Sequence, residues 1–191
     1  MSRIKKFKKI ELNFSSYPYF IKLAFFKPKD FIEQICLINQ IGISVIFLMA
    51  CYLIGVFLKI VVSFLESRQI ILLFLGISEN FILLPFILVL AFIVSLVYFI
   101  VAKFLKGQGS FRQIFILTNF SFVASIIPAV FGLEIVSFAW SGYLIFLGLR
   151  KINQYSNLAS LVNTIFPYMI LTLVLLILGL LNPASPGTFF G

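Results

Sequence analysis

Hydrophobic positions in this chain gather in long runs that short polar segments separate. The runs extend from about Ile35 or Ile41 to Leu58, from Phe81 to Ala102, from Ile114 to Phe131, from Ile135 to Leu149 and from Leu158 to Leu181. About 20 mostly apolar residues are needed for a helix to cross the hydrocarbon core of a bilayer. The pattern therefore predicts an all-α integral membrane protein with about five transmembrane helices, of which the fourth is short at its strictest limits.

The segments between the runs predict how the helices are connected. The stretch Ile60–Asn80 is expected to be a connection, and its apolar part Ile70–Ile77 is too short to cross. The glycine-containing turn 107–110 separates the second and third runs, and only Gly132–Glu134 separates the third and fourth, which predicts a tight helical hairpin. The tail 182–191 is uncharged and begins as a helix stop.

Basic residues are distributed unevenly among these segments. With the N-terminus inside and five alternating spans, thirteen of the fifteen Lys and Arg residues are cytoplasmic, and only Lys59 and Arg68 are outside. This follows the positive-inside rule. We therefore expect a cytoplasmic N-terminus and a C-terminus outside. The predicted organisation is a basic, aromatic-rich interfacial segment over residues 1–34, a five-helix membrane domain over 35–181 and a short extracytoplasmic tail over 182–191.

Composition agrees with a membrane protein and bears on its partners. Hydrophobic residues make up 62% of the chain and charged residues 11%, whereas a soluble domain is about one quarter charged. The formal net charge of +9 would favour nucleic-acid binding in a soluble protein. Here it marks the cytoplasmic side, so we expect membrane lipids as partners and no nucleic acid.

Residue types that carry chemistry are scarce. The chain has no histidine, and its two cysteines, Cys36 and Cys51, are separated along one apolar region, so we expect no disulfide. No charged residue lies in the middle of a predicted span, which argues against a coupled transporter or pump. We expect no catalytic residues, no metal, no cofactor and no enzymatic activity.

Small and polar residues recur on two predicted spans. Ser121, Ser125 and Ala129 share one face of the third span, and Thr164, Tyr168 and Thr172 share one face of the fifth. Such stripes favour close helix packing and hydrogen bonds between helices. The alternative is a polar cavity for a lipid or a small solute.

The order of several short motifs resembles the Yip domain family, small five-span membrane proteins named for their interaction with Ypt/Rab GTPases. The resemblance covers about residues 20–180. It rests on Phe26-Lys-Pro-Lys-Asp-Phe31 before the first span, on Gly107-Gln-Gly-Ser-Phe-Arg-Gln113, on Pro128, and on Trp140 with Gly148-Leu-Arg150. The residues that we single out for partner contact or packing are Gly107, Gly109, Ser110, Phe111, Arg112, Ser121, Ser125, Pro128, Trp140 and Gly148.

The resemblance implies a membrane-embedded binder and not an enzyme. We expect an accessory subunit or scaffold that binds other integral membrane proteins or a larger membrane complex. The short basic start is similar to prokaryotic members and lacks the long cytosolic N-terminal region of eukaryotic ones, which argues against a Rab-type GTPase partner and for a prokaryotic cytoplasmic (inner) membrane. The alternative function is a transporter, permease component or lipid-handling protein that uses the polar face of helices three and five.

Overall fold

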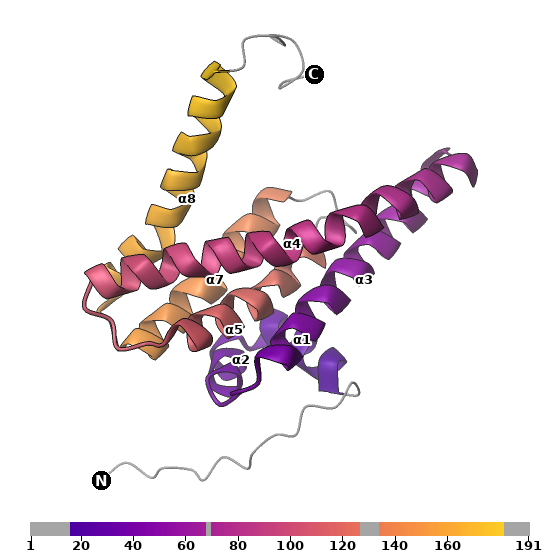
Figure 1. The fold of residues 1–191 in the computed structure, drawn as a ribbon. Coiled ribbons are helices and arrows are strands. Elements are labelled where there is room, and N and C mark those ends of the chain that lie inside the picture. The colour runs from indigo at the N-terminus through magenta and orange to yellow at the C-terminus, as the bar shows by residue number, and fades with distance from the viewer. Residues whose placement is uncertain (1–15, 68–69, 127–133, 182–191) are drawn as a thin grey trace.

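The computed structural model describes residues 16–67, 70–126 and 134–181, and every element within these ranges is a helix. The elements are α1 (Tyr17–Phe26), α2 (Pro28–Ile35), α3 (Ile41–Ser67), α4 (Ile70–Phe104), α5 (Phe111–Ser121), the 3₁₀ turn η2 (Phe122–Ser125), α7 (Glu134–Asn153) and α8 (Asn157–Leu181). Figure 1 shows the short α1 and α2 below the bundle and the C-terminal part of α8 rising away from it. The predicted helical class is confirmed.

The third hydrophobic run forms the centre of the bundle. All eight residues from Ile114 to Ser121 are buried, and α5 packs against α3, α4 and α7. A capping box begins the helix, because Ser110 accepts a hydrogen bond from the backbone N–H of Gln113 and the Gln113 side chain accepts one from the backbone N–H of Ser110. A helix that neighbours surround can be shorter than a lipid-facing one, and α5 gives way to 3₁₀ geometry at Phe122.

The outer helices carry apolar side chains that face away from the protein. Among the described residues, three helical stretches are long and apolar enough to cross a membrane: Ile41–Val62, Leu83–Phe104 and Ile135–Asn153. Phe111–Ala124 is apolar but shorter. Exposed large side chains such as Phe57, Phe86 and Phe138 project from these stretches, an arrangement that suits lipid and not water.

The segment predicted to connect the first two runs is helical instead. The helix α3 continues past Lys59 to Ser67, and α4 already begins at Ile70 (Figure 1). The sequence of this segment contains no proline, and the two glutamates Glu66 and Glu79 are not enough to end a helix. Pro85 lies inside α4 without ending it, as membrane helices tolerate when neighbouring groups satisfy the freed carbonyl.

The N-terminal segment contributes to the hydrophobic core. Phe20 of α1 and Phe31 of α2 are fully buried, and both rings contact Phe120 of α5, with centroids 5.8 and 6.3 Å away. Phe120 also stacks on Phe47 of α3 at 4.4 Å. Pro28 begins α2, a position where its missing N–H costs nothing. We call α1 and α2 together the N-terminal helix pair.

Candidate functional site

Three segments that are distant in the sequence meet at one end of the bundle. They are the N-terminal helix pair, residues 105–110 between α4 and α5 (the glycine loop), and the turn 154–156 between α7 and α8. Lys151 forms an ion pair with Glu33 at 3.1 Å, and the Arg112 guanidinium donates to the backbone carbonyl of Asn39. Lys29, Arg150 and Lys151 line one hollow here, and Lys103 and Lys106 lie at the glycine loop. We call this region the basic end.

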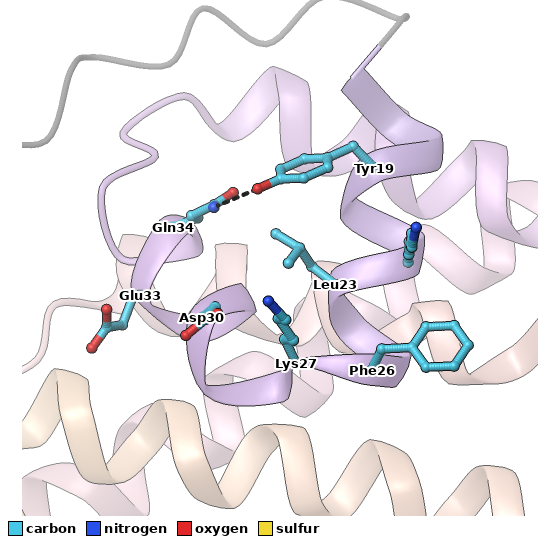
Figure 2. Close-up of a pocket in the computed structure, with 8 residues that line it drawn as sticks. Tyr19, Leu23, Phe26, Lys27, Asp30, Glu33 and Gln34 are labelled. Atoms are coloured by element: carbon cyan, nitrogen blue, oxygen red, sulfur yellow. Dashed lines mark hydrogen bonds between the residues drawn. The ribbon is translucent and has the colours of Figure 1, made fainter.

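The N-terminal helix pair encloses a hollow of about 510 Å³. Figure 2 shows Leu23 and Lys27 pointing toward the space between the two helices, and Phe26 and Glu33 also line the hollow. The hydroxyl of Tyr19 accepts a 3.2 Å hydrogen bond from the Gln34 amide, which joins the two walls. The lining of the hollow carries both lysines and carboxylates, and the buried rings of Phe20 and Phe31 hold this surface against the bundle.

Asn153 holds the glycine loop in place. Its side-chain oxygen Oδ1 accepts a 2.9 Å hydrogen bond from the backbone N–H of Gly109, and Asn153 itself is buried. The hydroxyl of Tyr155 donates to the carbonyl of Ala102 at 2.6 Å. Burial raises the pKa of Tyr155, and a backbone hydrogen bond with Gly107 partly opposes that rise.

Gly107 and Gly109 are both required because the loop lies so close to residues 152–155. A Cβ atom at Gly107 would lie 2.3 Å from the Tyr155 hydroxyl, and one at Gly109 would lie 2.5 Å from Cγ2 of Ile152. Neither position leaves room for a side chain. Lys106 turns the chain into the loop with φ of 59°, after the end of α4.

The other predicted loop residues have structural roles at the start of α5. Ser110 is its N-cap. The ring of Phe111 packs edge-on against Phe92 and Phe99, with centroids 5.4 and 5.8 Å away. The side chain of Arg112 is exposed apart from its bond to Asn39. The structure therefore brings Gly107, Gly109 and Ser110 into one held turn.

The remaining predicted residues are distributed through the bundle. Ser121 donates to the carbonyl of Leu117 on its own helix at 2.8 Å. Ser125 ends η2, its side chain lies outside the described part, and Pro128 lies outside the described residues. Gly148 allows α7 to approach α5, because a Cβ there would lie 2.2 Å from Cδ1 of Leu117.

Trp140 links α7 to the N-terminal helix pair. Its indole N–H donates to the carbonyl of Ala24 at 3.2 Å, and its ring stacks on Phe25 with centroids 6.5 Å apart. Trp140 therefore packs within the protein.

Two polar contacts were not predicted from the sequence. The amide of Asn119, in the last turn of α5, donates to the hydroxyl of Ser44 on α3 at 3.0 Å. Asn153 comes two residues after Lys151, one of the basic residues that end the fourth run, so the sequence placed it in a polar turn. The only sign of such a buried amide in the sequence is a polar residue inside an apolar run, and this does not reveal its partner on another helix.

The described residues contain no group of three or more Cys, Asp and Glu that could hold a metal ion. Several polar side chains at the basic end bind one another, carbonyl oxygens or backbone N–H groups. Chemically this end offers cations, hydrogen-bond donors and apolar hollows, which suit binding.

These features define an all-helical membrane protein with a charged, structured end. The chain belongs to the Yip1 domain family, whose model matches residues 21–179. The match begins within α1 and ends within α8, so the N-terminal helix pair and the membrane helices belong to one domain. At the similarity we required, the chain matches no curated protein and no solved structure.

Proposed function

We propose that this Yip1-family protein is a non-enzymatic accessory subunit or scaffold that binds other membrane proteins. The observation that carries the proposal is the N-terminal helix pair. Phe20 and Phe31 anchor it to Phe120 in the core, while Lys22, Lys27 and Asp30 remain exposed. A surface held in one conformation loses little entropy on binding, and its charges give a partner orientation and specificity.

We further propose five transmembrane helices with the N-terminus in the cytoplasm of a prokaryotic cell. Within the described residues, the basic segments that were expected inside are those that meet at the basic end. Only this sidedness puts their lysines and arginines on the side that the positive-inside rule favours.

The hydrogen bonds made by hydroxyl groups on α5 and α8 support a role in helix packing and not in a solute pathway. The hydroxyls of Thr118 and Ser121 donate to carbonyls one turn earlier on α5, and Thr164 does the same on α8. Ser160 donates across to the carbonyl of Phe146 on α7 at 2.7 Å. The protons of these hydroxyls are bonded within the bundle, so they are not donated to a solute.

Site-specific photocrosslinking in cells tests the scaffold proposal. A photoreactive amino acid replaces Phe26, which is exposed on α1, or Phe57, which is exposed within a candidate span as a matched control. We expect discrete protein adducts from position 26, and their loss when Lys22 and Lys27 are changed to Glu. Position 26 adducts that contain no other protein would contradict the proposal.

A further inference from the structure

One face of α7 remains open between two walls. On one side, Trp140 binds the N-terminal helix pair through Ala24 and Phe25. On the other side, α8 packs along α7, where the rings of Phe138 and Tyr168 lie 4.4 Å apart. We call the face of α7 between these contacts the α7 groove.

The floor of the α7 groove is apolar along most of its length. Ala139, Tyr143, Phe146 and Arg150 follow one another at spacings of four, three and four residues, so they lie on one face of the helix. A hollow of about 470 Å³ covers the first part, between α7 and α8. A Cβ atom at Gly142 would meet nothing within 4 Å, which shows open space above the helix backbone.

The same face becomes cationic at the end of α7. A second hollow, of about 520 Å³, is lined by Lys29 of α2 and by Arg150 and Lys151 of α7. Glu33 is the acidic residue in this lining, and it already pairs with Lys151 at 3.1 Å. Lys29 and Arg150 therefore supply positive charge that the lining itself does not neutralise.

The dimensions of the α7 groove match one leaflet of a bilayer. Ala139 and Arg150 are eleven positions apart, which is about 16 Å along a helix. Half of a typical hydrocarbon core is about 15 Å thick. An acyl chain lying on the apolar floor would place a headgroup phosphate at the basic end, where arginine and lysine donate to phosphate oxygens.

We propose that the α7 groove is a binding site for an anionic phospholipid. One acyl chain lies over Gly142 and Tyr143 between α7 and α8, and the headgroup phosphate binds Arg150 and Lys29. Charge complementarity selects an anionic lipid, because a zwitterionic headgroup brings its own cation to a site that already has an excess of positive charge.

Retention of lipid by the purified full-length protein in mild detergent tests this site. The probes are phosphatidylglycerol, phosphatidylcholine and inorganic phosphate, and native mass spectrometry reads the bound lipid. We expect phosphatidylglycerol to be retained at least tenfold better than phosphatidylcholine, with no retention of inorganic phosphate. Binding of inorganic phosphate as strong as that of the lipid would overturn the proposal, because the acyl chain would then contribute nothing.

Two variants separate the two halves of the site. Gly142→Leu fills the open space above α7, and Arg150→Gln removes the headgroup cation. We expect each to weaken phosphatidylglycerol binding about tenfold. Gly42→Leu, at a helical glycine that also has nothing within 4 Å, and Lys106→Gln, an exposed cation of the glycine loop, are the matched controls and should bind as the wild type does.

The location of the site is wrong if Gly142→Leu and Arg150→Gln retain as much phosphatidylglycerol as these controls. Loss in Arg150→Gln without loss in Gly142→Leu would overturn the placement of the acyl chain. The helical circular dichroism of each variant shows that it is folded, and the second variant keeps the test decisive where one fails to fold.

Discussion

The backbone N–H of Gly109 donates a 2.9 Å hydrogen bond to Oδ1 of Asn153, which lies 44 residues further along the chain. The bond joins the loop between α4 and α5 to the last turn of α7. It fixes two connections relative to each other at the basic end, where the structure also places the N-terminal helix pair. Removing either partner should therefore affect the whole of this end.

Replacing Asn153 with Ala should destabilise the protein by about 1–3 kcal/mol, because the buried N–H of Gly109 loses its acceptor. Thermal unfolding in mild detergent, followed by circular dichroism, measures the change. Gln108→Ala, at an exposed position of the same loop, is the control. Equal unfolding of the two variants would mean that the hydrogen bond contributes nothing to stability.

Replacing Gly109 with Ala should also destabilise the protein, by about 1–3 kcal/mol, because its Cβ would lie 2.5 Å from Cγ2 of Ile152. The matched change Gly42→Ala should be neutral or stabilising by up to about 1 kcal/mol, since alanine favours a helix and has open space there. Unfolding in the same detergent measures both. A Gly109→Ala protein as stable as Gly42→Ala would contradict the close approach.

The helical class and most helix positions could be predicted from hydropathy because long apolar runs are the strongest signal in a membrane sequence. The segment Ile60–Asn80 was expected to be a connection outside the helices, whereas α3 continues to Ser67 and α4 begins at Ile70. Charged residues end a transmembrane segment, but they do not end the helix itself.

The N-terminal helix pair was the part that sequence reasoning placed least well. Lysines among aromatic residues are typical of an interface between lipid and water, and that is how the segment was interpreted. The buried residues Phe31, Ile32 and Ile35 share one face of α2, but eight residues are too few for a reliable periodic signal. The buried face of α2 is evident only from the structure, where Phe31 contacts the ring of Phe120 on α5, which in turn stacks on Phe47 of α3.

The candidate residues were chosen from motifs, and the structure gives several of them a packing role. Gly107, Gly109 and Gly148 share one physical reason, the close approach of another element. That reason depends on which segments meet in space, and a single sequence does not contain it. Asn153 was missed in the sequence for this reason: its importance depends on a contact with a distant segment.

The thiol of Cys36, in the turn after α2, should react slowly with alkylating reagents. Burial raises its pKa to about 11, the Lys151 ammonium lowers it and the Glu33 carboxylate raises it. The thiolate is the reactive form, so alkylation at pH 8 should be roughly 100-fold slower than that of a thiol with a pKa near 9, and should rise about tenfold per pH unit up to pH 10.

Removing the Glu33 carboxylate should lower the pKa of Cys36 and speed its alkylation. Glu33→Gln removes one group that raises the pKa and leaves the Lys151 ammonium, which lowers it, without its ion-pair partner. Asp30→Asn, at an exposed carboxylate of the same helix, is the control. Mass spectrometry of the Cys36 peptide measures the rate, and equal rates in the two variants would contradict this electrostatic account.

Cysteines introduced at Gln108 and Asn157 should be labelled from the same side of the membrane. Both positions are exposed at the basic end, one in the glycine loop and one at the start of α8. A reagent that does not cross membranes should label both only after the cytoplasmic side is made accessible. Lys59→Cys, near the other end of the first span, is the control and should be labelled from outside. Labelling of Gln108→Cys and Asn157→Cys from opposite sides would contradict the proposed sidedness.

The central claim is that this Yip1-family protein works by binding other membrane proteins, and the mass of the particle extracted from native membranes tests it most directly. The chain alone has a mass of 21.7 kDa. Native mass spectrometry after extraction in mild detergent should show a larger particle that contains a second membrane protein in fixed proportion. Changing Lys22 and Lys27 to Glu should reduce that particle to the 21.7 kDa chain. A wild-type protein recovered only as a monomer, with no protein partner, would contradict the account.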